Sequence, residues 1–205
     1  MSNAVTDERL SLRERRRLEM ATQVETVAMR QFIEEGYDNV SVAEICEISG
    51  ISPSTFFRHF GSKDGVVVDI IRQVNGRVAR WLATAGDDDR FVAPYVGALR
   101  KEYEEAGYLD SDYMYRSVKV VVGPKVRAIY LDHLSEGHAA MDAEIARRLR
   151  IPADGPEIRS VRAIQWIAID QAMQSLLRGE QLDDLMKRIE ENLVLLARME
   201  NETPR

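Results

Sequence analysis

Four arginines crowd together near the beginning of the sequence, at positions 13, 15, 16 and 17. A guanidinium group stays charged at any ordinary pH, and its planar set of N–H donors matches phosphate oxygens. Four small residues, Ser52 to Thr55, stand at the start of a predicted short helix. Together the two clusters could hold a phosphate backbone and present small groups to base edges. The alternative is a solvated helix face that binds nothing.

The total charge of the chain gives no support to a nucleic-acid partner. Its 28 lysines and arginines are outnumbered by 34 aspartates and glutamates, for a net charge of −6. The first 75 residues hold nine basic and twelve acidic side chains, so the acidic excess is also present there. The phosphate-binding interpretation therefore depends on where the arginines lie, and not on the sum of the charges.

Helical periodicity fills most of the 205 residues, and no stretch alternates between apolar and polar residues as a half-buried strand would. Only 12 glycines and 6 prolines interrupt the chain. The sequence predicts an all-α fold of about nine helices, one for each periodic segment between breaks. These segments are residues 12–35, 42–48, 53–60, 63–85, 91–106, 110–122, 124–150, 156–178 and 182–199.

Two of the predicted helices are short and are defined by their capping residues. Ser41 and Glu44 have the spacing of a capping box. Ser52 is a second N-cap, and Pro53 follows at the first helical position, where its missing N–H costs nothing. Gly50 lies in the turn between the two helices. Such a pair is the signature of a helix-turn-helix, in which the start of the second helix approaches base edges.

The stretch from residue 32 to residue 67 reads FIEEGYDNVSVAEICEISGISPSTFFRHFGSKDGVV. Its characteristic positions are Phe32, Gly36, Ser41, Val42, Ile45, Gly50, Ser52, Thr55, His59, Phe60 and Lys63. With this pattern, residues 13–75 closely resemble the N-terminal domain of the TetR/AcrR family of transcriptional regulators. The resemblance implies a helix-turn-helix domain that binds DNA, followed by a larger helical domain that dimerises and often binds a small effector.

The resemblance also implies which residues contact DNA. Ser41 and Lys63, at two helix starts, are expected to contact phosphates, and Ser52, Ser54 and Thr55 are expected to read bases or adjacent phosphates. The full expected set is Arg16, Arg17, Ser41, Ser52, Pro53, Ser54, Thr55, Phe57, Arg58, His59 and Lys63.

One position departs from the family pattern. Phe57 stands where the family usually has a tyrosine that donates to a phosphate. Either this contact is lost, at a cost of about 1 kcal/mol of binding free energy, or Arg58 and the arginines near the N-terminus compensate for it.

The expected domains are residues 10–75, with the helix over 63–85 as a connector, and residues 86–205. The last two predicted helices are apolar over more than one face, and the family buries this surface in a four-helix bundle between two copies. Packing within one chain is the alternative. The expected dimer residues are Ile164, Ala168, Leu185, Ile189, Leu193 and Leu196.

Aromatic side chains are numerous in the second domain, on helices that could converge near the end of the connector. Such a pocket suits a small, mostly apolar effector with one or two hydrogen-bonding groups. The expected lining residues are Trp81, Tyr103, Met114, Tyr115, Trp166 and Asp170. The alternatives are core or surface positions for the aromatic residues and a hydrogen bond across the dimer interface for Asp170.

Other kinds of chemistry find no support. The one cysteine, Cys46, is expected to be buried and inert, and it excludes an internal disulfide or a multi-cysteine metal site. No phosphate-binding glycine loop or nucleophile motif is present, so we expect no enzyme activity, no metal and no cofactor. No apolar run could span a membrane and no export signal is visible, so we expect a cytoplasmic protein.

The residues and the resemblance together predict a homodimeric DNA-binding transcriptional regulator. We expect a repressor that binds a palindromic operator and is released by a small effector. One alternative is a regulator that binds DNA and dimerises without any ligand. The other is a helical scaffold protein that keeps the fold but does not bind DNA.

Overall fold

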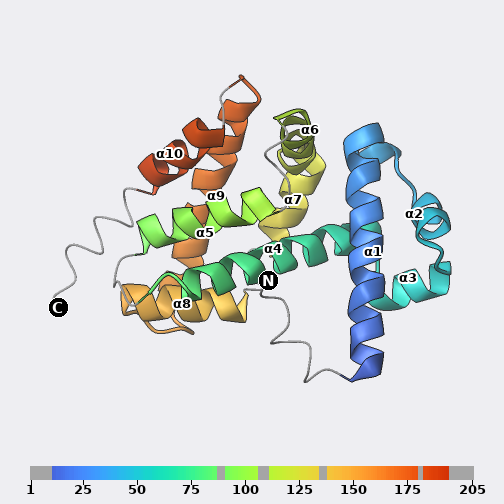
Figure 1. The fold of residues 1–205 in the computed structure, drawn as a ribbon, viewed down its shortest axis with the longest axis horizontal. Coiled ribbons are helices and arrows are strands. Elements are labelled where there is room, and N and C mark those ends of the chain that lie inside the picture. Colours follow the sequence, from blue (N-terminus) through green and yellow to red (C-terminus); the bar gives the residue numbers. More distant parts are fainter. Residues whose placement is uncertain (1–10, 87–90, 106–110, 134–137, 180–181, 194–205) are drawn as a thin grey trace. The chain divides into compact units, whose positions relative to one another are not determined.

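The computed structural model describes residues 11–86, 91–105, 111–133, 138–179 and 182–193 (Figure 1). All regular structure in these ranges is helical, with ten α-helices and one 3-10 turn. The prediction of an all-α fold is therefore confirmed. In the described part of the chain, none of the helices combines the length and the apolar character that a membrane span requires. The chain divides into two compact units, residues 1–70 and 71–205.

The first unit is built from short elements with defined ends. Its elements are α1 (Leu12–Glu35), the 3-10 turn η2 (Tyr37–Asn39), α2 (Val42–Ser49), α3 (Pro53–Phe60) and the beginning of α4 (Lys63–Ala83). The predicted capping box of α2 is present, and Ser52 caps α3 with Pro53 in its first turn. Gly36, Gly50 and Gly61 follow α1, α2 and α3 with φ of 87°, 67° and 74°, which favours glycine there.

Aromatic side chains form much of the core of the first unit. Phe32 on α1 packs on Tyr37, with ring centroids 4.9 Å apart. Phe56 and Phe60 lie one turn apart on α3, with centroids 5.2 Å apart, and both are buried. Cys46 is buried on α2 and burial raises the pKa of its thiol, in agreement with the expected inert role. The inner faces of the two short helices are thus fully used for packing.

The ammonium group of Lys63 ties the beginning of α4 to the turn before α2. Its Nζ donates to the carbonyl oxygens of Tyr37 at 2.7 Å and of Val40 at 2.8 Å. It also lies 4.3 Å from the centroid of the Tyr37 ring. The Tyr37 hydroxyl donates to Asp64, and burial, followed by this bond, raises the pKa of Tyr37. Lys63 and its neighbour Asp64 therefore hold η2 in place, which fixes the entry into α2.

We expect Lys63→Met to destabilise the first unit. The substitution keeps most of the side-chain volume but leaves two carbonyl oxygens without their charged donor. This loss should lower the free energy of unfolding by about 2 kcal/mol. Urea unfolding followed by circular dichroism, with hydrogen exchange of the α2 amides, measures the loss. Lys101→Met is the matched control, because Lys101 is exposed and lies 3.7 Å from the ring centroid of Trp81. It should lose less than about 1 kcal/mol. Equal stability of Lys63→Met and wild type would contradict the account.

The second unit contains the rest of α4 and six further helices in the described ranges. These are α5 (Val92–Glu105), α6 (Ser111–Val121), α7 (Pro124–His133), α8 (Ala139–Leu149), α9 (Pro156–Leu176) and α10 (Leu182–Asn192). The predicted single helix over 124–150 is thus two helices, which raises the count from about nine to ten. His138 begins α8 as its N-cap, with an extended backbone and Nδ1 accepting from the amide of Met141 at 3.4 Å.

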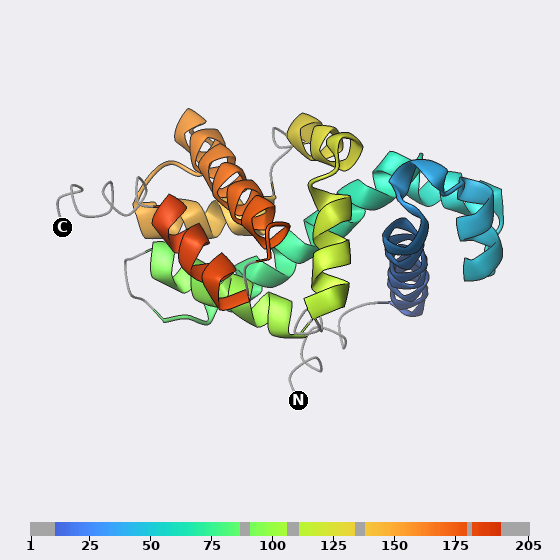
Figure 2. The same ribbon diagram turned by 90° about the horizontal axis from the view of Figure 1, so that it is seen from above.

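Apolar side chains from α4, α5, α8, α9 and α10 share one core in the second unit. The helices α9 and α10 pack side by side, and α10 also contacts α5 (Figure 2). The buried Arg148 donates to the carbonyl oxygens of Leu82 at 2.8 Å and Gly86 at 3.1 Å. This side chain therefore satisfies backbone groups at the end of α4 and joins that end to α8.

The apolar stripe of α10 faces the core of its own chain. Leu185, Ile189 and Leu193 are at most 1% exposed, and Ala168 on α9 is equally buried. These side chains are covered within their own chain, and their expected place in a dimer interface stays a prediction. Ile164 is half-buried against the same core, and Leu196 lies outside the described residues.

Candidate nucleic-acid interface

The helix α3 has one buried and one exposed face. Phe56 and Phe60 anchor it to the core, whereas Pro53, Ser54, Phe57 and Arg58 are exposed. Residues 53, 54, 57 and 58 are neighbours at the i, i+3 and i+4 spacings of one helix surface. The structure therefore brings together four of the residues expected to contact DNA. Thr55 and His59 lie at the margins of this face and are half-buried.

The start of α3 is held by hydroxyl groups. The Thr55 amide donates to Ser52 Oγ at 3.2 Å, and Ser52 Oγ lies 3.0 Å from Thr55 Oγ1. Each hydroxyl has both donor and acceptor capacity, so the pair can still bond to a ligand. Ser54 is exposed beside this pair. The polar groups at the start of α3 are thus positioned before any ligand arrives.

Ser41 has the same kind of role at the start of α2. Its Oγ accepts from the amide of Glu44 at 3.2 Å, and its own amide donates to the Glu44 carboxylate at 2.7 Å. The hydrogen bonds from Ser41 lower the pKa of Glu44. The Ser41 hydroxyl is exposed and keeps its proton for donation, so its expected contact with a phosphate stays a prediction.

Lys63 differs from the free point charge that the resemblance implies. Two of its three N–H groups are directed to the carbonyl oxygens of η2, and the side chain is half-buried. A contact with a phosphate would use the remaining N–H. The first role has no local sequence signal, because Tyr37 and Val40 lie 26 and 23 residues away in the chain.

The basic start of α1 lies near α3. Arg13, Arg15, Arg16 and Arg17 are all exposed. Burial lowers the pKa of His59, and the positive charge of Arg17 lowers it further. The negative charge of Asp69 raises this pKa, and the positive charge of Arg58 lowers it. An electrostatic effect of Arg17 on His59 requires the two charges to be close. The exposed arginines of α1 and the end of α3 therefore contribute to one positively charged region.

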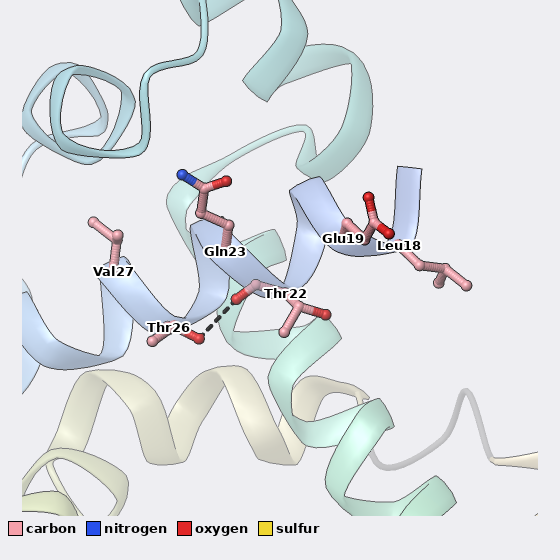
Figure 3. A pocket seen from close by; sticks show the side chains of 6 residues that line it. All are labelled: Leu18, Glu19, Thr22, Gln23, Thr26 and Val27. Atoms are coloured by element: carbon pink, nitrogen blue, oxygen red, sulfur yellow. Dashed lines mark hydrogen bonds between the residues drawn. The ribbon is translucent and has the colours of Figure 1, made fainter. Parts of the chain in front are cut away.

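A shallow open groove runs along α1 (Figure 3). It is lined by Leu18, Glu19, Thr22, Gln23, Thr26 and Val27. The Thr26 hydroxyl donates to the Thr22 carbonyl oxygen at 2.8 Å, and the Gln23 amide group donates to the Ser49 carbonyl oxygen at 3.2 Å. The side chains of Gln23 and Thr26 are thus engaged within the unit, and the lining contains one charged residue, Glu19.

The residues expected to line an effector pocket have different surroundings. Trp166 is buried and stacks on Tyr130, with centroids 3.6 Å apart and planes 18° apart. Trp81 is half-buried beneath the ammonium group of Lys101. Tyr103 is half-buried against the core, whereas Tyr115 is 38% exposed and lies near Lys119. The side chain of Met114 lies outside the described residues. The proposed pocket thus stays a prediction.

Asp170 is buried on α9 and forms an ion pair with Arg127 on α7, at 2.9 Å. Tyr130, one turn after Arg127, is half-buried and stacks on Trp166, and burial raises its pKa to about 12. Arg127 and Tyr130 were not predicted as partners of α9. They are separated from it by about 40 residues, and no local pattern indicates this pairing. Among the described residues, no group of three histidine, cysteine or acidic side chains could hold a metal ion.

A capped helix pair with an exposed polar second helix defines a helix-turn-helix protein, here with a second helical unit. The pattern described as "Bacterial regulatory proteins, tetR family" matches residues 26–70. This match shows that residues 26–70 have the sequence pattern of the N-terminal domain of the TetR family. That family consists of transcription regulators, which agrees with the expectation that the chain is not an enzyme.

Two curated relatives are similar over part of the chain. The transcriptional repressor BdcR of Escherichia coli is 37% identical over 71 residues, or 35% of this chain and 36% of BdcR. The repressor AcnR of Corynebacterium efficiens is 27% identical over 120 residues, or 58% of this chain and 61% of AcnR. The chain thus matches between about a third and three fifths of these relatives.

A solved structure extends the likeness to most of the chain. The TetR/AcrR-type transcriptional regulator from Aquifex aeolicus superposes with a TM-score of 0.52 and 19% identity, covering 86% of this chain and 99% of that one. At this identity the comparison shows a shared fold. The helical second unit is included in this shared fold.

We expect the pH dependence of DNA binding to report on His59. Its pKa is lowered in the free protein, so the imidazole is neutral at pH 7. Neighbouring phosphates would favour the charged form, so binding should take up a proton and strengthen as the pH falls from 7.5 to 5.5. Anisotropy of a labelled duplex measures this change. His59→Gln should remove most of the pH dependence, and an unchanged profile in that variant would contradict the assignment.

Proposed function

We propose that the protein is a DNA-binding transcriptional regulator and that the exposed face of α3 enters the major groove. The observation that carries this proposal is the placement of Ser54, Phe57 and Arg58 on one surface of a helix anchored by two buried phenylalanines. Small residues at the start of α3 allow close approach to base edges. The exposed arginines of α1 supply charge for the phosphate backbone, which dominates affinity.

The regulator acts as a homodimer on a palindromic operator. A single helix-turn-helix contacts one half-site, and a two-fold dimer matches two half-sites related by symmetry. Because α10 uses its apolar stripe within the chain, the contact between copies falls on exposed parts of the second unit. Ile167 on α9 is 52% exposed, and the half-buried Ile164 precedes it by one turn. This part of α9 is the proposed contact between the two copies.

We further propose that a small, mostly apolar effector releases the regulator from its DNA. The stack of the buried Trp166 on the half-buried Tyr130 supplies an aromatic surface in the second unit. Trp81 Nε1 and Asp170 Oδ1 are buried and lack a hydrogen-bond partner among the described residues. Buried polar groups of this kind are normally satisfied. Each of these two atoms could therefore bond to a polar group of a ligand. Both curated relatives are named as repressors, which supports the same sign of regulation.

Selection of random duplex DNA by the purified full chain tests the function. We expect enrichment of one near-palindromic sequence at low salt, bound by two copies of the chain. Ile167→Glu should bind the same half-site sequence as a single copy, with weaker affinity, because the charge opposes burial of α9 against a second copy. Sedimentation of the free and DNA-bound chain gives the number of copies.

Leu185→Ala is the control for this experiment. Leu185 is buried in its own chain, so its truncation should lower stability by about 2–5 kcal/mol and leave the dimer of the folded fraction intact. Failure to enrich any DNA at low salt would contradict the proposed function and favour a scaffold protein. A palindrome bound tightly by a single copy would contradict the dimer but not the DNA-binding function.

A further inference from the structure

A large apolar side chain lies in the middle of the proposed reading face. Phe57 is 51% exposed and follows Pro53 by four residues and Ser54 by three, so it is central among the exposed residues of α3. Single exposed apolar residues are common on protein surfaces. This one is unusual for its place, because the neighbouring positions of the same face are small or charged.

The ring of Phe57 has a defined orientation. It meets the ring of Phe56 edge to face, with centroids 5.6 Å apart and planes at 84°. Phe56 is fully buried and cannot move without disturbing the core of the first unit. An aromatic side chain also has only two rotatable bonds, so little conformational freedom remains to be lost on binding. The free protein thus presents a nearly fixed apolar surface.

The chemistry of base edges restricts what this surface can contact. A phenylalanine side chain neither donates nor accepts hydrogen bonds, so it cannot bond to a phosphate oxygen. The edges exposed in the major groove are polar, with one exception, the C5-methyl group of thymine. An apolar ring buried against any other base edge would remove water from polar atoms without replacing their hydrogen bonds, which is unfavourable.

We propose that Phe57 is a specificity-determining residue that recognises thymine in each half-site through its C5-methyl group. This inference rests on the proposed function and adds a chemical rule for one operator position. Ser54 and Arg58, which flank Phe57 on the exposed face, contact the adjacent base and backbone. Burial of one methyl group against the ring corresponds to about fourfold in affinity per half-site, and so to about fifteenfold for a symmetric site.

Replacement of thymine by deoxyuridine in the selected operator tests the proposal. Deoxyuridine forms the same base pair but lacks the methyl group. Each thymine is replaced in turn, symmetrically in both half-sites, and the dissociation constant is measured for the wild-type chain. We expect one position at which affinity falls about fifteenfold. Phe57→Ala should bind the thymine and deoxyuridine operators equally at that position.

Two further variants separate recognition from folding. Phe57→Tyr keeps the ring and should keep the preference for thymine. Ile48→Ala removes another apolar side chain that is 49% exposed, but on α2, and should also keep the preference. Circular dichroism verifies that each variant is folded. If Phe57→Ala does not fold, Phe57→Ser is used in its place. If neither variant folds, the deoxyuridine series with the wild-type chain tests the contact with the thymine methyl group.

The outcomes distinguish this proposal from the proposed function. Tight operator binding with no loss at any deoxyuridine position would overturn the role of Phe57 and leave the DNA-binding function intact. The same applies if Phe57→Ala retains the wild-type preference, since another residue would then contact the methyl group. Absence of any DNA binding by the wild-type chain would contradict both.

Discussion

A helix of eight residues is too short to be stable in water, and α3 is such a helix. Its position depends on the burial of Phe56 and Phe60 against the rest of the first unit. These two side chains also determine the opposite face, because the residues at the remaining helical positions must point outward. The same packing that makes the helix possible therefore defines the surface proposed to contact DNA.

The ends of the short elements are fixed by polar groups. Ser41 and Ser52 cap α2 and α3, and Lys63 holds the turn η2 through two carbonyl oxygens. Residues expected to touch DNA thus also stabilise the domain that presents them. This dual use keeps the proposed contacting groups in place before binding, so little conformational entropy remains to be lost when DNA is bound.

Local signals explain which features could be predicted. The caps of α2 and α3 and the glycines after them act within a few residues, so the sequence revealed the helix-turn-helix. The break between α7 and α8 was missed because histidine is an uncommon N-cap. The burial of Leu185 and Ile189 was missed because an apolar stripe does not say which surface covers it. The bonds of Lys63 and Asp170 connect distant residues and have no sequence signature.

The central claim, that the outer face of α3 is the DNA-binding surface, is tested most directly by charge reversal at two exposed arginines. Arg58 lies on α3, and Arg30 lies near the far end of α1. Arg58→Glu and Arg30→Glu change the net charge equally. We predict that operator affinity at fixed salt falls at least about 30-fold for Arg58→Glu and less than about threefold for Arg30→Glu. Equal losses in the two folded variants would contradict the claim.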